Sequence, residues 1–221
     1  MKRLLGLGLF AGALLGTFAI LQTAQPGWWE RLWYPLHYES IVRGHARNYD
    51  LDPALLAAVI YQESKFKAGA TSKSGAIGLM QLLPDTAKGI ALHTGGTQFR
   101  VEDLYDPEIN VRYGAWYLRH LLQKYGDERT ALAAYNAGQD NVDRWRRNGE
   151  GIQFAETRAY VDRVEKLKGI YRRAYGADLG AWAGHPVSVP GRFAITNWSA
   201  ASDSLSRMSL ARTRTSYSPF G

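Results

Sequence analysis

Apolar side chains recur every three or four residues through most of this chain, which is the spacing that gathers them on one face of an α-helix. The pattern predicts helices over residues 37–48, 52–64, 84–92, 108–125, 128–137, 139–147 and 155–175. Residues 66–83 are instead rich in glycine, serine and threonine, and short strands are expected only there. The sequence therefore predicts a mainly α fold with one small, irregular β segment.

One of these helices ends on an acidic residue. Asp52 followed by Pro53 has the residue types of an N-cap and a first helical position, so the helix should begin there. At helical spacing Glu63 shares a face with Val59 and Ile60, and its carboxyl should point with the apolar side chains. Burial disfavours the charged form and raises the pKa of a carboxyl, as a general acid working near neutral pH requires. Glu63 is therefore the first candidate for catalysis.

The N-terminal segment has the composition of a sequence directed to a membrane. Lys2 and Arg3 precede an uncharged, apolar run over residues 4–21, which is about the minimum length for a bilayer-spanning helix. Tryptophans follow where an interfacial aromatic belt is expected. Because the candidate cleavage site is poor, we interpret residues 1–27 as an uncleaved anchor, with a cleaved signal peptide as the alternative. Either interpretation exports the remainder of the chain.

The helical pattern is accounted for by one domain over residues 28–178, since a core of about 140 residues can be stable alone. Over residues 179–221 serine, glycine, proline and arginine replace the pattern. Such a segment buries too little apolar surface to offset the entropy lost on ordering, and we expect a disordered C-terminal tail.

Composition narrows the chemistry further. The chain has no cysteine, which excludes disulfides, thiolate metal sites and a thiol nucleophile. Its five histidines lack the paired spacing of metal ligands, so we expect no metal and no cofactor. The formal net charge of +7 favours anionic partners. Because no nucleic-acid-binding motif is visible, an anionic cell-wall polymer is the simpler partner, and no nucleic acid is expected.

Three separated blocks resemble the motifs of the soluble lytic transglycosylase family. The first spans residues 63–88 and begins with Glu-Ser; the others are Ala-Tyr-Asn-Ala-Gly at 134–138 and Glu-Thr-Arg-Ala-Tyr-Val at 156–161. The resemblance extends over about residues 37–175. It implies a lysozyme-like α+β domain, with the β segment near a catalytic groove, that cleaves the glycan strands of peptidoglycan. Such a protein would work in the cell envelope, here anchored on the periplasmic side of the inner membrane or secreted to the periplasm.

The resemblance also implies a mechanism that uses one carboxyl group. Glu63 would protonate the oxygen of the β-1,4 bond between N-acetylmuramic acid and N-acetylglucosamine, while the N-acetyl group of the substrate stabilises the cationic centre. The same carboxylate would then take the proton of the C6 hydroxyl, which closes onto C1 and leaves a 1,6-anhydromuramic end. The positions that match the substrate-binding residues of the family are Ser72, Met80, Gln81, Tyr135, Asn136, Glu156 and Tyr160.

Structural roles compete with these assignments at two positions in particular. Met80 could fill a gap in the core, and Asn136 could end a helix next to Gly138. Ser64 is interpreted only as a hydrogen-bonding residue at a helix end.

Three alternative functions remain open at this stage. A hydrolase resembling goose-type lysozyme would need an aspartate to activate water, whereas Asp50, Asp52 and Asp85 have the positions of helix-start residues. A non-catalytic peptidoglycan-binding module would not require Glu63. A wall-opening component of a secretion or phage apparatus would share the chemistry and differ in its partners.

Overall fold

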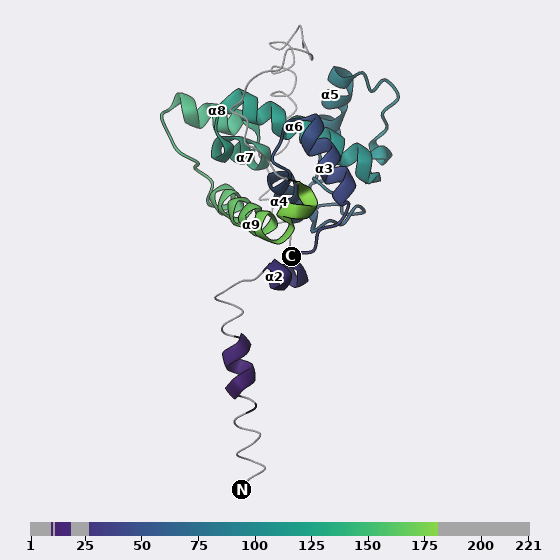
Figure 1. Cartoon of the computed structure of the whole chain (residues 1–221). Coiled ribbons are helices and arrows are strands. Elements are labelled where there is room, and N and C mark those ends of the chain that lie inside the picture. Colours follow the sequence, from purple (N-terminus) through teal and green to yellow (C-terminus); the bar gives the residue numbers. More distant parts are fainter. Residues whose placement is uncertain (1–9, 11, 19–26, 181–221) are drawn as a thin grey trace.

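The computed structural model describes residues 10, 12–18 and 27–180, and it is mainly helical (Figure 1). The predicted tail beyond residue 180 and most of the predicted anchor lie outside the described residues. The elements are α2 (Gly27–Trp33), α3 (Glu39–Asn48), α4 (Pro53–Ser64), α5 (Pro84–Thr94), the 3-10 helix η1 (Val101–Tyr105), α6 (Pro107–Tyr125), α7 (Glu128–Ala137), α8 (Gln139–Arg147) and α9 (Ala155–Leu179).

Each of the predicted helices is present, and the differences lie at their ends and in two short additions. The helix predicted over 84–92 continues to Thr94 and ends at Gly95, whose φ of 77° suits glycine. The helix predicted over 155–175 continues to Leu179 across a non-helical Tyr175. The sequence pattern did not predict α2 or η1, because segments of seven and five residues are too short to show a helical period.

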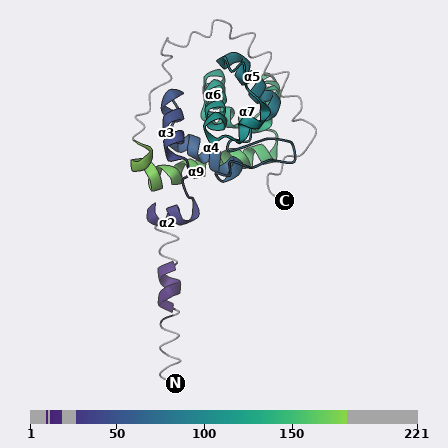
Figure 2. The ribbon, with the colours of Figure 1, turned by 90° about the vertical axis from the view of Figure 1, so that its right-hand side faces the viewer.

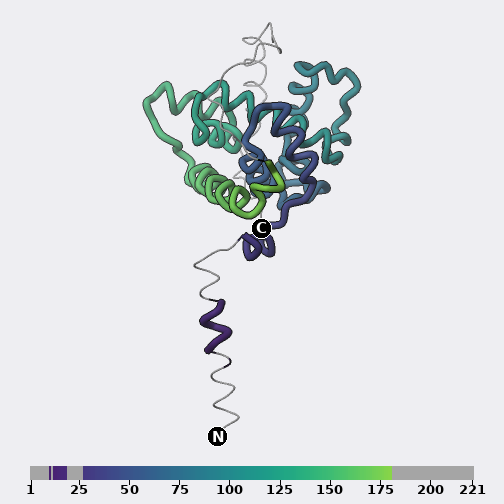
Figure 3. Tube along the Cα trace, viewed as in Figure 1, coloured from purple at the N-terminus to yellow at the C-terminus, as the bar shows by residue number. Residues whose placement is uncertain are grey.

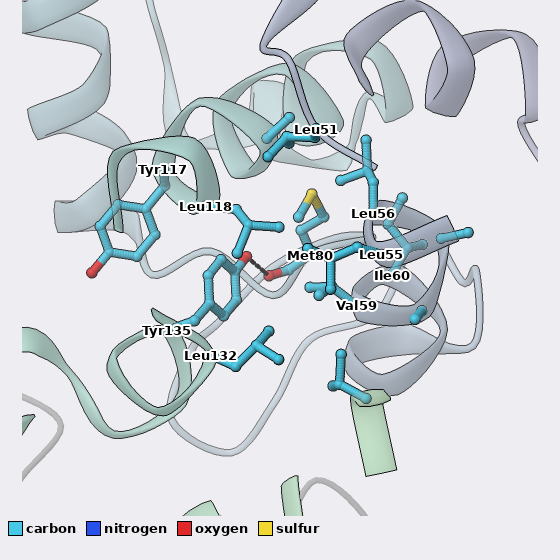
Figure 4. Close-up of a cluster of buried hydrophobic side chains, with 14 of the residues drawn as sticks. Leu51, Leu55, Leu56, Val59, Ile60, Met80, Tyr117, Leu118, Leu132 and Tyr135 are labelled. Atoms are coloured by element: carbon cyan, nitrogen blue, oxygen red, sulfur yellow. Dashed lines mark hydrogen bonds between the residues drawn. The ribbon is translucent and has the colours of Figure 1, made fainter. Parts of the chain in front are cut away.

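Helix α4 is the centre of the domain. It packs along α9 and also meets α3, and the trace shows both neighbours around it (Figures 2 and 3). Ten of its twelve residues are buried, so α4 is apolar on nearly every side instead of only one. The core around it is built from Leu55, Leu56 and Val59 of α4, Leu118 of α6 and Leu132 of α7 (Figure 4).

The N-terminus of α4 is fixed by a buried acid. Asp52 is 7% exposed, and its Oδ1 accepts a hydrogen bond of 2.9 Å from the backbone N–H of Ala54, which confirms the predicted cap. Its Oδ2 pairs with Arg172 of α9 and lies 3.6 Å from Nζ of Lys168. Because a buried charge is costly unless it is paired, these contacts fix where α9 lies along α4.

The segment 66–83 was expected to contain short strands and has only isolated bridges. Ile77 forms isolated antiparallel bridges with Thr71 and with Leu82, and these bridges do not extend into a strand. The segment is thus a compact loop with β-like pairing, located directly after the helix that carries Glu63.

The turn from α4 into this segment is conformationally demanding. Lys65 and Phe66 both have left-handed backbone angles, with φ of 50° and 60°. Left-handed conformations cost energy in residues other than glycine and persist where the surroundings fix them. Phe66 is 5% exposed, and its ring contacts those of Tyr61 and Tyr171. Burial of this ring supplies the stabilisation that holds the turn.

Asn110 of α6 holds the loop from inside the domain. Its Nδ2 donates to the carbonyls of Ile77 (2.9 Å) and Leu104 (2.8 Å), and its Oδ1 accepts from the N–H of Met80 (2.8 Å). Gly78 makes room for this side chain, since a Cβ there would lie 2.1 Å from Asn110 Nδ2. Asn110 was not predicted from the sequence, because nothing in the local pattern of α6 marks a fully buried amide.

Among residues 10, 12–18 and 27–180, no helix is both long and apolar enough to cross a bilayer.

We predict that Asn110→Ala lowers the free energy of unfolding by at least about 3 kcal/mol, because each buried backbone group left without a partner costs about 1–3 kcal/mol. Chemical denaturation measures the change. Asn148→Ala is the control, since Asn148 is exposed at the end of α8 and should change stability by less than about 0.5 kcal/mol. Equal effects of the two substitutions would contradict the role of Asn110.

Candidate active site

The predicted acid lies where two helices meet. Glu63 is in the last turn of α4 and is 5% exposed, and Tyr160 of α9 is 3% exposed. The hydroxyl of Tyr160 donates a hydrogen bond of 2.8 Å to Oε1 of Glu63. The carboxyl therefore points with the apolar side of α4, as predicted, and a donor from the last sequence block orients it. The family resemblance implied that Tyr160 contacts substrate, and it did not predict the direct hydrogen bond between Tyr160 and Glu63.

The residue after Glu63 joins α4 to the glycine-rich loop. Ser64 is buried, and its Oγ lies 2.8 Å from the carbonyl oxygen of Leu79 and 3.2 Å from that of Ile60. The second contact is the helix-end hydrogen bond expected from the sequence. The first reaches across to the loop, so Ser64 sets the distance between α4 and residues 79–81.

Gln81 closes this loop. It is 4% exposed and has a left-handed φ of 49°. Its Nε2 donates to the carbonyls of Gly78 (2.9 Å) and Ala70 (3.2 Å). Both contacts use the amide nitrogen, so Gln81 stabilises the loop through its donor side.

Tyr135 of α7 reaches the same loop from the opposite side. Its hydroxyl donates a hydrogen bond of 2.8 Å to the carbonyl of Met80 (Figure 4). The side chain of Met80 is fully buried, and a Cβ on Gly114 of α6 would lie 2.3 Å from its sulfur. This burial favours the core-filling interpretation of Met80 over direct contact with a substrate.

The wall behind Tyr135 is aromatic and uncharged. The ring of Tyr117 lies 5.6 Å from that of Tyr135 and stacks on His120. Burial, followed by the charge of Lys124, lowers the pKa of His120 to about 4. His120 is therefore neutral at pH 7 and adds no positive charge behind the site.

The remaining candidates lie at different depths. Asn136 is half-buried, and its Oδ1 accepts a 2.8 Å hydrogen bond from Thr157, which joins α7 to α9. Glu156 is exposed in the first turn of α9. Ser72 is half-buried, and its Oγ accepts from the N–H of Ala76 (3.0 Å), so the hydroxyl stabilises its own turn.

The aspartates closest to Glu63 in sequence have other partners. Asp52 caps α4, and Asp85 lies in the first turn of α5, 3.4 Å from Nζ of Lys88. Asp50 was expected at a helix start, and this was wrong: it lies in the turn before α4 with φ of 50° and forms a 3.0 Å ion pair with Arg119. Within the described part of the chain, no group of three or more histidine, aspartate or glutamate side chains could hold a metal ion.

Comparison with known proteins identifies the family. The family model described as the transglycosylase SLT domain matches residues 40–156, more than half of the chain, and the chain belongs to this family. The soluble lytic murein transglycosylase of Salmonella typhimurium is 33% identical over 181 residues, covering 67% of this chain and 27% of that protein. The membrane-bound lytic murein transglycosylase F of Pseudomonas fluorescens is 33% identical over 162 residues, covering 68% of this chain and 31% of that protein.

A solved structure supports the same assignment. The lytic transglycosylase Slt of Pseudomonas aeruginosa, crystallised as an inactive glutamate-to-glutamine mutant, matches with a TM-score of 0.62 at 32% identity, over 69% of this chain and 27% of that one. The predicted fold class, a mainly α lysozyme-like domain, is thereby confirmed. The chain spans less than a third of the length of each of these relatives.

We predict that Tyr160→Phe lowers stability more at mildly alkaline pH than at acid pH. The hydroxyl stabilises the ionised carboxylate more than the neutral acid, and the unfolded state is the same in both proteins, so its loss costs most where Glu63 of the folded protein is ionised. Melting temperatures of variant and wild type across this range measure the effect. Tyr171→Phe is the control, because that hydroxyl on the same helix donates to the neutral carbonyl of Pro35. The same pH dependence in both variants would show that the Glu63 contact is not its source.

Proposed function

We propose that this chain is a lytic transglycosylase that cleaves the β-1,4 bond between N-acetylmuramic acid and N-acetylglucosamine in peptidoglycan and leaves 1,6-anhydromuramic ends. The observation that carries the proposal is the buried Glu63 carboxyl, held by Tyr160 at the meeting point of α4, α9 and the loop around Gln81. The family to which the chain belongs, and the activity for which its relatives are named, support the choice of substrate.

The geometry supports Glu63 as the acid. A carboxyl with little water around it resists ionisation, which favours a protonated group before the bond is cleaved. Because the hydroxyl of Tyr160 donates to Oε1, that oxygen acts as the acceptor and the acidic proton belongs on Oε2. From there it would pass to the glycosidic oxygen, and the bond to C1 of the muramic acid would break.

The second step needs a base rather than a second carboxylate. The ionised Glu63 would accept the proton of the C6 hydroxyl, and the hydroxyl oxygen would bond to C1 and close the anhydro ring. The Tyr160 hydrogen bond supports this step too, since a donor stabilises the carboxylate formed by the first. The partners found for Asp50, Asp52 and Asp85 favour this one-acid mechanism over a hydrolysis that needs an aspartate to activate water.

The substrate-binding roles follow from the position of each residue in the site. Gln81 and Tyr135 hold the loop that would meet the sugar, and Tyr135 would also approach the N-acetyl group. Asn136 joins α7 to α9, while the half-buried Ser72 would bind the sugar near the scissile bond and the exposed Glu156 would contact the glycan along the groove. Met80 would act from the core, by supporting the backbone that carries Gln81.

For location, we propose the periplasmic side of the inner membrane, with residues 1–27 as the anchor. The charge pattern and apolar run of that segment support this, and one relative is described as membrane-bound. The wall-remodelling role could belong to general maintenance of the wall or to a secretion or phage apparatus, and the chemistry would be the same.

We predict that Glu63→Gln reduces turnover of purified peptidoglycan by at least about 100- to 10,000-fold, the typical contribution of a general acid or base. The amide keeps the shape and can still accept from Tyr160, so the melting temperature and sedimentation with intact cell wall should be retained. Glu102→Gln, an exposed substitution in η1, is the matched control and should keep wild-type turnover. A Glu63→Gln variant with a tenth of normal activity would exclude Glu63 as the acid.

We also predict that the products carry an anhydro ring and incorporate no oxygen from solvent. Mass spectrometry of digests made in water labelled with heavy oxygen distinguishes a lytic transglycosylase from a hydrolase. A lysozyme-like hydrolase would place a labelled hydroxyl at the new reducing end. Absence of any cleavage by the wild-type chain, together with binding to the wall, would instead favour the non-catalytic module.

A further inference from the structure

Helix α2 presents its large apolar side chains to the outside of the domain. Trp28 is 58% exposed, Leu32 67% and Trp33 58%, and the half-buried Trp29 lies between the two other tryptophans, 5.9 and 6.0 Å from their rings. We call these four residues the α2 aromatic face. Clustered exposed apolar side chains of this size mark an interaction surface, because isolated ones are common and clusters are not.

The polar side chains of α2 bind the helix to the domain. Glu30 is 3% exposed and pairs with Arg173 of α9, while Arg31 donates to the carbonyl of Ala174 (2.8 Å) and to Asp178 Oδ2 (2.6 Å). This is the reverse of an ordinary surface helix, which packs its apolar side inward. The α2 aromatic face is therefore directed outward by specific charged contacts on the opposite side.

Helix α2 also contacts the catalytic helix directly. The hydroxyl of Tyr61 lies 3.2 Å from the carbonyl oxygen of Trp33, and the rings of Tyr61 and Tyr34 are 5.5 Å apart. Tyr61 is two residues before Glu63 on α4. A surface that holds α2 thus also holds the end of α4 that carries the acid.

We propose that the α2 aromatic face lies in the headgroup region of a lipid bilayer and that the contacts of α2 with α9 and α4 fix the orientation of the catalytic domain on the membrane. This rests on the proposed membrane location and goes beyond it: the domain would be seated on the bilayer instead of hanging from a loose linker. Glu63 would then act at one fixed height above the membrane and reach only the glycan strands at that height.

The chain around α2 favours lipid as the occupant. The described N-terminal residues are exposed and apolar, including Phe10, Leu14 and Leu15, and the ring of Phe18 meets that of Trp29 edge-on at 5.9 Å. The α2 aromatic face therefore meets the exposed residues 12–18 through the ring of Phe18. Tryptophan is enriched at membrane interfaces because its ring is apolar and its N–H is polar. Figures 1 and 2 both show α2 on the side of the domain nearest residues 12–18, with α5 at the far end.

The absence of cysteine makes a direct test possible. The full-length chain is prepared as Leu32→Cys, labelled with a polarity-sensitive fluorophore, and reconstituted into vesicles of phosphatidylethanolamine and phosphatidylglycerol. Leu92→Cys is the matched control, because Leu92 is also an exposed leucine and lies on the distant α5. We expect the label at 32 to shift to the blue and lose most of its fluorescence to a nitroxide carried near the lipid headgroup, and the label at 92 to do neither.

Equal responses at the two positions would overturn the proposal. A blue shift at 32 that occurs without lipid, rises with protein concentration and ignores the nitroxide would also overturn it, since a second copy of the chain would then be the occupant. Turnover of soluble glycan fragments is measured on the same samples, so a failure of the proposed chemistry is distinguished from a failure of the membrane contact.

A separate experiment measures the orientation of the catalytic domain on the membrane. Energy transfer from the label at 92 to an acceptor dye on the lipid headgroup reports the height of the far end of the domain. Replacing Glu30 and Arg31 together by glutamine removes the ion pairs that hold α2 and should broaden the distribution of transfer efficiencies. Arg129→Gln, which removes surface ion pairs to Asp162 and Glu165 elsewhere on α9, should leave the distribution unchanged. The same width of the transfer-efficiency distribution in the wild type and both variants would contradict a fixed orientation of the domain on the membrane.

Discussion

The packing of α4 along α9 is the constraint on which the rest of the structure depends. It brings the last turn of the first helix to the beginning of the second, so that residues 63 and 160, ninety-seven positions apart, share one hydrogen bond. Apolar burial on nearly every side of α4 provides the main driving force, and the Asp52 ion pairs fix the register. The pairing of Tyr160 with Glu63 is thus a product of core packing, because any shift of α9 along α4 would separate the tyrosine from the carboxyl.

Much of the loop beside the acid is held by polar groups that are themselves buried. Asn110, Ser64, Gln81 and Tyr135 each bond to backbone atoms of residues 70–80, and together they replace the regular hydrogen bonds that a strand would have supplied. The left-handed turn at Lys65 and Phe66 allows the loop to fold back toward the helix that precedes it. A preorganised loop of this kind keeps its shape when substrate enters, which reduces the reorganisation required during catalysis.

The charged residues and the apolar residues of α2 have different roles. Its ion pairs with α9 replace the usual packing of an apolar stripe, and this leaves the tryptophans to face outward. Through the hydrogen bond of Tyr61 with Trp33, the same short helix contacts α4. In the proposed membrane-bound state, the contact of Tyr61 with Trp33 would therefore link the helix at the bilayer to α4, the helix that carries Glu63.

The sequence by itself determined seven of the helices and the family, and it marked Glu63 as the candidate acid. Helical periodicity is a local property, and Asp52, Pro53 and the apolar spacing up to Glu63 are all read within one segment. The three motif blocks then identified the family without any knowledge of how they meet. Glycine and serine in residues 66–83 indicated turns, and the β pairing there is smaller than the short strands that were expected.

Only the tertiary structure decided which residues act on one another. The contact of Tyr160 with Glu63, the burial of Met80 against Gly114 and the place of Asn110 under the loop join segments far apart in the chain. The position of helix α2 could not be predicted from the sequence either, because it is fixed by hydrogen bonds with α9, about 140 residues later. Periodicity reports which side of a segment is buried, whereas the partner across the interface depends on how separate helices pack, and that information is not local.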